Sequence, residues 1–464
     1  MLVGLLLAFG YSTIGFGVFP TSASAYDTQR LVLLLFLGFV YFLLYRVPLK
    51  LSSANSFLII ILLLIQLALL PFRGYLVSAL LDLLFFTFFS LTMLRLVDFL
   101  SKLDFDSIHY FLRVLVLTFF AYYLMILMQL LFFVLEPLPW TIHLLSPEYP
   151  NVRIFNHVQV LVFPICWYLA FLDTESKTVR IEKTFYKFCC VFTIAFLLHS
   201  NARGATLVVI GQSFLMIVLL NYLGLKPWRS SLKNIMSVWI IGISTFFILF
   251  VWVPSLFINE VSTVKLRTTS SGRFGMWIEA LKLWSQNPIF GFGGMSYIQK
   301  ELGITYRFGS PHNSVVQILF EYGLVGLSLI TASVVVFFGK LWRLLKLSRS
   351  AIHTSAVISV IGGMVLSLAS GVIGVPLSQL ILFVLISTLA AAEIRYRSNV
   401  TIESSLERYS IRPLWSNFLG VLLFVSLIGL ALVTRVELAG GDPSVYYVGP
   451  RFWEAGLLGS FKGL

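Results

Sequence analysis

The sequence of 464 residues predicts an all-α fold, a polytopic integral membrane helical bundle of about 12 to 13 transmembrane helices with one large outer loop containing short amphipathic helices. Three observations predict it. Hydrophobic residues make up 58% of the chain, charged residues only 11%, and the mean hydropathy is +0.93. Apolar runs of roughly 17 to 25 residues, enough to cross about 30 Å of hydrocarbon as helices, recur along the whole length. A single polar stretch of about fifty residues interrupts them.

The transmembrane spans follow from the apolar runs, and the short intervals between them are expected to be loops. The intervals at 200–204 and 371–376 are so short that a broken or re-entrant helix is the alternative to a hairpin. The expected spans lie near residues 2–18, 30–46, 54–71, 76–98, 110–135, 155–172, 184–199, 204–222, 235–255, 315–340, 355–371, 376–393 and 413–434.

The spans and the polar stretch divide the chain into four parts. Residues 1–258 carry about nine N-terminal transmembrane helices, and residues 259–314 form the large outer loop. Residues 315–435 carry about four further helices, and residues 436–464 form an interfacial tail rich in aromatic side chains. The first 25 residues end in Ala-Ser-Ala like a signal peptide, but no Lys or Arg precedes the apolar run, so we expect a retained helix.

Lysine and arginine assign the orientation, because positively charged loops stay on the cytoplasmic side of a membrane. With the amino terminus inside, every inner loop is richer in these residues than its outer neighbours. The formal net charge of +13 therefore reflects topology and needs no nucleic-acid partner. The large loop then faces outside. The short outer loops before it hold only Arg30, Arg73, Arg153 and Arg203.

The large outer loop is expected to contain an amphipathic helix that begins at Arg273 and stops at Asn287-Pro288. Such a helix lies on the membrane or caps the bundle, and the backbone donors at its start favour an anion beside Arg273. Its apolar side carries Phe274, Trp277, Ile278, Leu281 and Trp284, and its other side carries Glu279, Lys282 and Gln286.

Arg153, Arg203 and Arg273 all stand at outer membrane edges, against the positive-inside tendency. Any one of them alone is equally explained by snorkelling to lipid phosphates. Several together suit a diphosphate, because planar guanidinium groups bind phosphate oxygens bidentately and stay charged. The pattern therefore predicts a lipid-linked diphosphate as ligand. His312 lies just before the tenth span. On general grounds such a histidine is a helix cap or an interfacial residue, but its occurrence together with the three arginines favours a role in the same site.

These residues resemble the superfamily of O-antigen ligases and O-antigen polymerases, which are bacterial inner-membrane enzymes. The resemblance is strongest between Arg273 and Leu327, with Ser-Gly-Arg-Phe, Asn-Pro-Ile-Phe-Gly-Phe-Gly, Pro-His-Asn-Ser and Glu-Tyr-Gly-Leu-Val-Gly-Leu in order. The turn at residues 200–204 and the segment 151–159 resemble further motifs of the superfamily. Together the motifs cover roughly a fifth of the chain, and the resemblance implies a GT-C-like bundle.

The resemblance implies a multi-pass inner-membrane glycosyltransferase whose active site faces the periplasm. Its donor would be a glycan linked to undecaprenyl diphosphate, its acceptor a sugar hydroxyl of the lipid A core or of another glycan, and its other partners membrane lipids. No metal and no cofactor is expected. Arg203 and Arg273 would hold the diphosphate, with Arg153 as a third member, and His312 would serve the acceptor hydroxyl. The expected supporting residues are Gln159, Ser200 and Asn313.

Two alternatives stay open. A polymerase that joins lipid-linked repeat units shares the arginines and the histidine and differs only in its acceptor, so the motifs do not separate it from a ligase. A transporter of lipid-linked sugars fits the number of spans and the intramembrane Asp82 and Arg113, but the chain has no convincing internal repeat. Asp82 and Arg113 are expected to pair between helices. The three cysteines lack metal-ligand spacing, so we expect packing roles for Cys166, Cys189 and Cys190.

Overall fold

The chain is almost entirely helical where the structure describes it. This computed structural model describes residues 25–44, 47, 49–50, 54–70, 76–103, 105–135, 152–172, 180–257, 272–298, 310–400, 410–411 and 413–436. The one sheet among these residues is an antiparallel pair of two-residue strands, β1 (Leu49–Lys50) and β2 (Ser410–Ile411). The predicted all-α bundle is confirmed.

The long helices follow the predicted spans closely. The first predicted span, 2–18, lies outside the described residues. The long helices are α2 (Ala25–Leu43), α3 (Ala54–Leu69), α4 (Leu76–Leu100), α5 (Phe105–Leu135), α6 (Val152–Phe171), α7 (Arg180–His199), α8 (Arg203–Tyr222), α9 (Trp228–Phe247), α12 (Ser314–Ser348), α13 (Ala351–Ser367), α14 (Pro376–Val400) and α15 (Pro413–Val436). Helix α9 continues through a π-helical turn, η3 (Ile248–Trp252), into α10 (Val253–Phe257).

Length and composition suit these helices, other than α7, to a membrane. Six stretches are long and apolar enough to cross one, and five shorter apolar helices accompany them. Many large apolar side chains on the outer faces of α8 and α9 are exposed, including Leu207 and Phe214 at 67% each. In water such a surface would drive aggregation, whereas in hydrocarbon it is the favourable one. The chain is therefore a polytopic membrane bundle.

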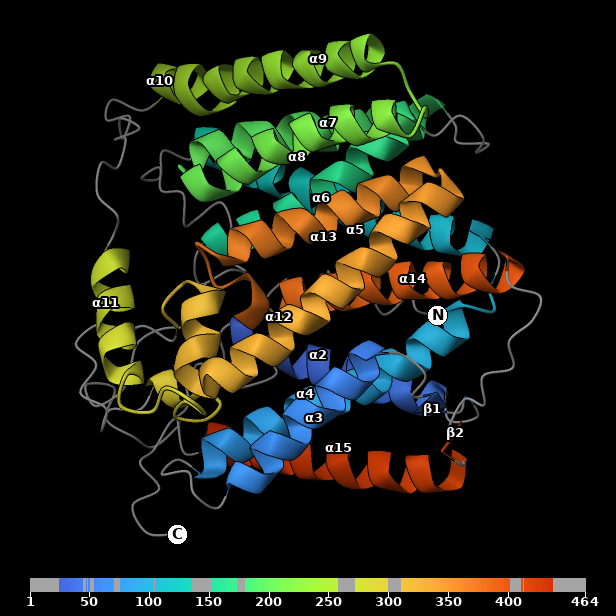
Figure 1. Cartoon of the computed structure of the whole chain (residues 1–464). Helices are drawn as coiled ribbons and strands as arrows, with labels where there is room; N and C mark the ends of the chain where they lie inside the picture. The colour runs from blue at the N-terminus through green and yellow to red at the C-terminus, as the bar shows by residue number, and fades with distance from the viewer. Residues whose placement is uncertain are drawn as a thin grey trace.

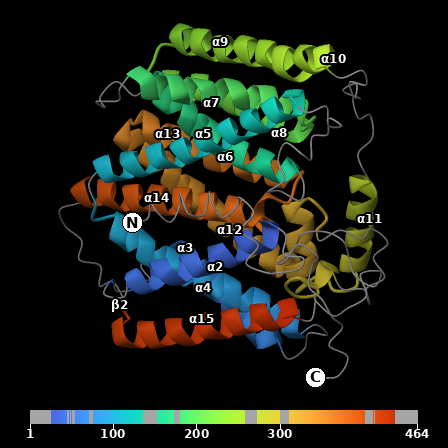
Figure 2. The same ribbon diagram turned by 180° about the vertical axis from the view of Figure 1, so that it is seen from behind.

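Two apolar cores hold the bundle together. The larger core is built from α5 to α9 with α13, and the smaller one from α2, α4 and α15. Helix α14 joins them, because Leu380, Phe383 and Val384 enter the smaller core while Ile381 and Leu385 enter the larger one. Both views place α9 at one extreme of the stack and α15 at the other (Figures 1 and 2).

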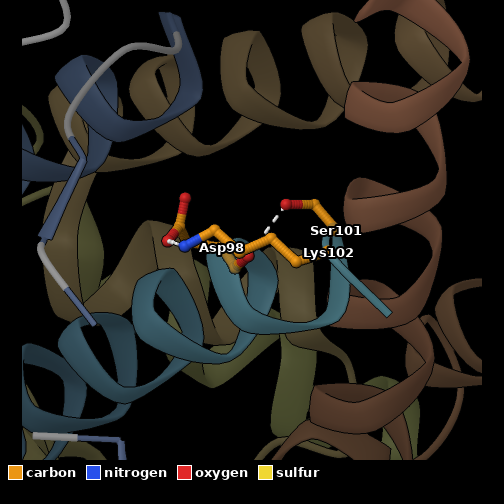
Figure 3. Close-up of polar contacts among 3 residues, drawn as sticks. All are labelled: Asp98, Ser101 and Lys102. Atoms are coloured by element: carbon orange, nitrogen blue, oxygen red, sulfur yellow. Dashed lines mark hydrogen bonds and ion pairs between the residues drawn. The ribbon is translucent and has the colours of Figure 1, made fainter. Parts of the chain in front are cut away.

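One end of the bundle, here called the basic end, is fastened by cationic side chains. Lys102 Nζ lies 2.8 Å from Asp98 Oδ2 and Ser101 Oγ donates to Asp98 O, just past the last turn of α4 (Figure 3). The Arg395 guanidinium of α14 donates to Leu100 O over 2.9 Å, which satisfies one of the carbonyls that a helix leaves open at its C-terminus. By the positive-inside rule this end is expected to face the cytoplasm.

The intramembrane charges are paired between helices, but not with each other. Arg113 of α5 pairs with Glu182 of α7, and Tyr186 also donates to that carboxylate. Asp82 of α4 accepts a hydrogen bond from Tyr322 of α12. The expected pair of Asp82 with Arg113 is therefore wrong, because each of the two residues contacts a side chain of a different helix instead. The cysteines at 166, 189 and 190 are buried and free, as packing residues are.

Helix α12 is broken at Gly323, whose φ of 66° and ψ of −166° are not helical. In a continuous helix the N–H groups of residues 324 and 325 would donate to the carbonyls of residues 320 and 321. Here they donate instead to Pro288 O and Ile289 O, while the N–H groups of Phe292 and Gly293 donate to the two carbonyls left open. The segment 288–293 thus replaces two helical hydrogen bonds with four bonds of its own. Irregular backbone at membrane depth requires such internal partners.

The predicted amphipathic helix is α11 (Arg273–Trp284), which stands across the ends of the long helices (Figures 1 and 2). Met276 and Ala280 are buried against the bundle, whereas Phe274 and Ile278 are 64% and 61% exposed. The exposed apolar side chains suit a membrane interface. Helix α11 therefore ties the large loop to one end of the bundle, the end opposite the basic one.

Candidate functional site

The candidate site lies at the end of the bundle that α11 covers, here called the site end. Five chain segments meet there: the starts of α6, α8, α11 and α12, and the loop 368–375 between α13 and α14. Each contributes a polar side chain or backbone group to one cluster. The cluster thus combines residues that are far apart in sequence.

Arg203 is the first residue of α8 and follows the tight turn 200–202. Asn201 in this turn has a φ of 51°, and Arg203 N donates to Asn201 O over 3.1 Å. Ala202 precedes the helix without a side-chain cap, so the first N–H groups of α8 are not satisfied by a capping side chain. The Arg203 side chain is exposed at this position.

Arg273 is the first residue of α11 and is half-buried. Gly272 before it has a φ of 75° and provides no capping side chain. One guanidinium nitrogen of Arg273 donates to Ala369 O over 2.6 Å. Burial, and then the nearby positive charge of Arg203, lower the pKa of the Arg273 guanidinium below its usual value. Among the described residues, no carboxylate pairs with Arg273. Two guanidinium groups at two uncapped helix starts make this corner electropositive.

His312 precedes α12 in a left-handed conformation, with a φ of 54°. For a residue with a side chain this conformation costs about 1–2 kcal/mol, so its neighbours must hold it. Asn313 is the helix cap and accepts from Val315 N and Val316 N over 3.0 and 3.2 Å. Trp277 of α11 donates to Pro311 O over 2.8 Å. The cap and the indole therefore fix the two residues on either side of His312.

His157, in the second turn of α6, links the loop 368–375 to the rest of the cluster. Its Nε2 lies 2.6 Å from Ser370 Oγ, and the side chain is only 4% exposed. His312 and Arg273 are its titratable neighbours. A Cβ added at Gly371 would lie 3.5 Å from Ser310 Oγ and 3.9 Å from His312 Nδ1, so this loop also lies against the start of α12.

The residues predicted for the site fall into two groups. Arg203, Arg273 and His312 come together at the site end, and Asn313 supports His312 as a cap. Ser200 donates to Asn156 Oδ1 over 3.2 Å and joins the turn before α8 to the start of α6. Of the two remaining residues, Gln159 lies away from this cluster and the Arg153 side chain is outside the described part of the chain.

Gln159 is fully buried in the larger core, where its Nε2 donates to Tyr123 Oη over 2.7 Å. It therefore supports the contact between α5 and α6 and not the arginines. Arg153 lies in the first turn of α6, and its side chain is outside the described part of the chain. The role of Arg153 stays a prediction.

Sequence reasoning missed His157, Ser370 and Ala369. A polar Asn-His pair at the start of an apolar span was the available signal for His157. No comparable signal marks Ala369, because it contributes only its carbonyl oxygen. In the described ranges, no group of three His, Cys, Asp or Glu side chains is placed to hold a metal ion.

Comparison with known proteins agrees with the motifs. Residues 188–331 match the family model described as O-antigen ligase. The match includes Arg203, Arg273 and His312, and it covers less than a third of the chain. No curated protein sequence matches the chain significantly. Over residues 188–331 the chain is therefore similar to the O-antigen ligase family.

Proposed function

We propose that the protein is an O-antigen ligase-type glycosyltransferase. It moves a glycan from undecaprenyl diphosphate to a sugar hydroxyl of the lipid A core on the periplasmic side of the inner membrane. The observation that carries the proposal is the pair of arginines, Arg203 and Arg273, which begin two neighbouring helices beside His312. The family match over residues 188–331 supports the same enzyme type.

The arginine pair suits a diphosphate leaving group. Bringing two like charges together is unfavourable without an anion between them, and the lowered pKa of Arg273 reflects that repulsion together with burial. A diphosphate bound between the two arginines would offset their repulsion and accept hydrogen bonds from both guanidinium groups. The uncapped N–H groups at the starts of α8 and α11 add further donors. This set would stabilise the charge that grows on the diphosphate as its bond to the sugar breaks.

His312 is proposed to act on the acceptor. In the transfer, the acceptor oxygen forms a bond to the anomeric carbon of the donor glycan, and the bond from that carbon to the diphosphate oxygen breaks. The acceptor hydroxyl loses its proton in the same reaction. A partly exposed imidazole beside the arginines can take that proton or orient the hydroxyl. No metal enters this scheme, because the arginines carry the charge of the leaving group.

The orientation of the site follows from charge. The cationic residues of the basic end, such as Arg395 and Lys102, lie at the far ends of the helices from His312. Positive loops favour the cytoplasm, so the site end would face the periplasm. A lipid A core acceptor and a second lipid-linked glycan would both reach a site on that face. A polymerase is therefore the second candidate, and the acceptor assay below separates the two.

The proposal is tested with purified protein, a glycan linked to undecaprenyl diphosphate as donor, and lipid A core or a second lipid-linked glycan as acceptor. Transfer to lipid A core supports the ligase, and elongation of the lipid-linked glycan supports the polymerase. We expect Arg273→Ala and His312→Ala each to lower kcat by roughly 10²–10³-fold, which is the usual cost of one lost charge-stabilising or proton-transferring group.

The matched control is Lys102→Ala, which removes a cation from the basic end. Its side chain is 57% exposed and pairs only with Asp98 in the described structure. This variant should transfer glycan at the wild-type rate. If the Arg273 and His312 variants also transfer at the wild-type rate, the proposed mechanism is wrong.

A further inference from the structure

We propose that the loop Leu368–Val375 between α13 and α14 positions Arg273 for the departing diphosphate, with Ser370 and His157 as the positioning pair. The inference rests on the proposed function. It assigns a role to residues that lie outside the segment 188–331 of the family match. The loop contacts Arg273 through its backbone, by the carbonyl oxygen of Ala369.

The contact between Arg273 and Ala369 orients the planar guanidinium group. An arginine carries five N–H donors in one plane, and a single anchored nitrogen fixes that plane. The bond from Arg273 Nη1 to Ala369 O is 2.6 Å long, so this nitrogen is occupied. The remaining donors of the same group are left for phosphate oxygens. Moving Ala369 O would therefore rotate the donors away from their target.

Ser370, the next residue along the loop, is held from the opposite side by α6. The 2.6 Å contact between Ser370 Oγ and His157 Nε2 joins the loop to a side chain that is only 4% exposed. The other ring nitrogen, His157 Nδ1, is buried and has no partner among the described residues. The bond to Ser370 is thus the single hydrogen bond of this buried imidazole within the described part of the chain. A buried polar group with one partner is costly to leave unpaired.

The far end of the loop is held by α2. Arg30 donates to Gly374 O over 2.6 Å and to Gln379 Oε1, and its side chain is 2% exposed. Its guanidinium also lies over the Phe85 ring, 5.5 Å from the centroid. The loop is therefore held at both ends, by Arg30 and by His157. Such rigid support is what a group needs if it is to orient a charge-stabilising arginine.

The test uses Ser370→Ala and His157→Gln in the full-length protein. Ser370→Ala removes the hydroxyl, whereas the glutamine amide retains a donor that can reach Ser370. We expect Ser370→Ala to lower kcat roughly 10-fold or more with little change in the KM for the donor, because misplacing a catalytic group by a fraction of an ångström affects the transition state most. His157→Gln should retain more activity than His157→Leu.

A double-mutant cycle asks whether Ser370 acts through Arg273. In an Arg273→Lys background the fork that Ala369 O orients is gone, so adding Ser370→Ala should lower kcat by less than twofold. The matched control is Ser367→Ala, since Ser367 donates only to Met364 O within α13 in the described structure. It should leave kcat unchanged in both backgrounds.

The outcomes separate this inference from the proposed function. If wild-type protein transfers glycan but Ser370→Ala has the wild-type kcat, the loop does not position Arg273 and the inference is wrong. Equal losses from Ser370→Ala in both backgrounds would show that Ser370 acts independently of the arginine, which also overturns it. If wild-type protein transfers no glycan to either acceptor, the proposed function itself fails.

Discussion

Replacing Gly323 by alanine tests the break in α12. Glycine is required there because the backbone adopts a φ of 66° with a ψ of −166°, a region that other residues avoid. An added Cβ would lie 2.2 Å from Ile289 O and 2.6 Å from Gly291 N. Both atoms belong to the backbone, so no side-chain rotation relieves the overlap. The alanine variant must either strain the break or remove it.

The two responses have similar magnitudes. Retaining the break places alanine in a disfavoured region, at about 1–3 kcal/mol. Removing it restores the two helical bonds that residues 324 and 325 would make, but releases the four bonds that the segment 288–293 forms. The net loss is two hydrogen bonds, at about 1 kcal/mol each. Either route costs about 2 kcal/mol. Removing the break would also make the first turns of α12 coaxial with the rest of that helix, and this would displace His312, which precedes them.

Thermal unfolding in detergent, followed by tryptophan fluorescence, measures the loss of stability. We expect Gly323→Ala to lower the midpoint by about 2–5 °C, and to lower kcat by roughly 10-fold or more because His312 is displaced. The control is Gly339→Ala in the same helix, where an added Cβ meets nothing within 4 Å. It should unfold at or slightly above the wild-type midpoint. Identical midpoints and rates for the two variants would refute the account of the break.

Substitutions at three further positions probe other contacts. Asn313→Ala removes the cap of α12 and should cost about 1 kcal/mol in thermal unfolding, and Asn313→Asp should restore it. Tyr322→Phe leaves the buried Asp82 carboxylate without this donor and should cost about 1–3 kcal/mol; a midpoint equal to the wild type would contradict the pairing. Lys102→Ala removes an exposed lysine from the buried Asp98 carboxylate and should cost no more than about 1 kcal/mol in unfolding free energy, and a larger loss would show that Asp98 depends on this lysine.

The helices could be predicted from the sequence because lipid imposes a simple rule. A segment that crosses hydrocarbon must satisfy its own backbone hydrogen bonds, so length and apolarity alone mark a helix. Helix α3, for example, was expected at 54–71 and runs from Ala54 to Leu69. Arg203, Arg273 and His312 were recognisable for the complementary reason. Each is a polar residue at the edge of an apolar segment, a position that a membrane-spanning helix does not require to be polar.

The contacts that hold the site could not be predicted, because they depend on pairing between distant segments. Gly323 lies in an apolar stretch of the sequence, but nothing in its vicinity indicates that residues 288–293 complete the break. Gln159 lies two residues from His157 in α6, and that separation turns the two side chains to different faces. One enters the core beside Tyr123 and the other contacts Ser370. The sequence does not say which face meets the loop.

The family domain and the site therefore do not coincide. Residues 188–331 include α8, α11 and the start of α12, and hence both arginines of the pair and His312. The groups that orient them come from α6 and from the loop after α13, which lie outside that segment. Helix α7 packs on α5 and α6, and α8 packs on α13, so the matched segment lacks much of its own core. Substitutions in the flanking helices should consequently alter transfer even where every motif residue is intact.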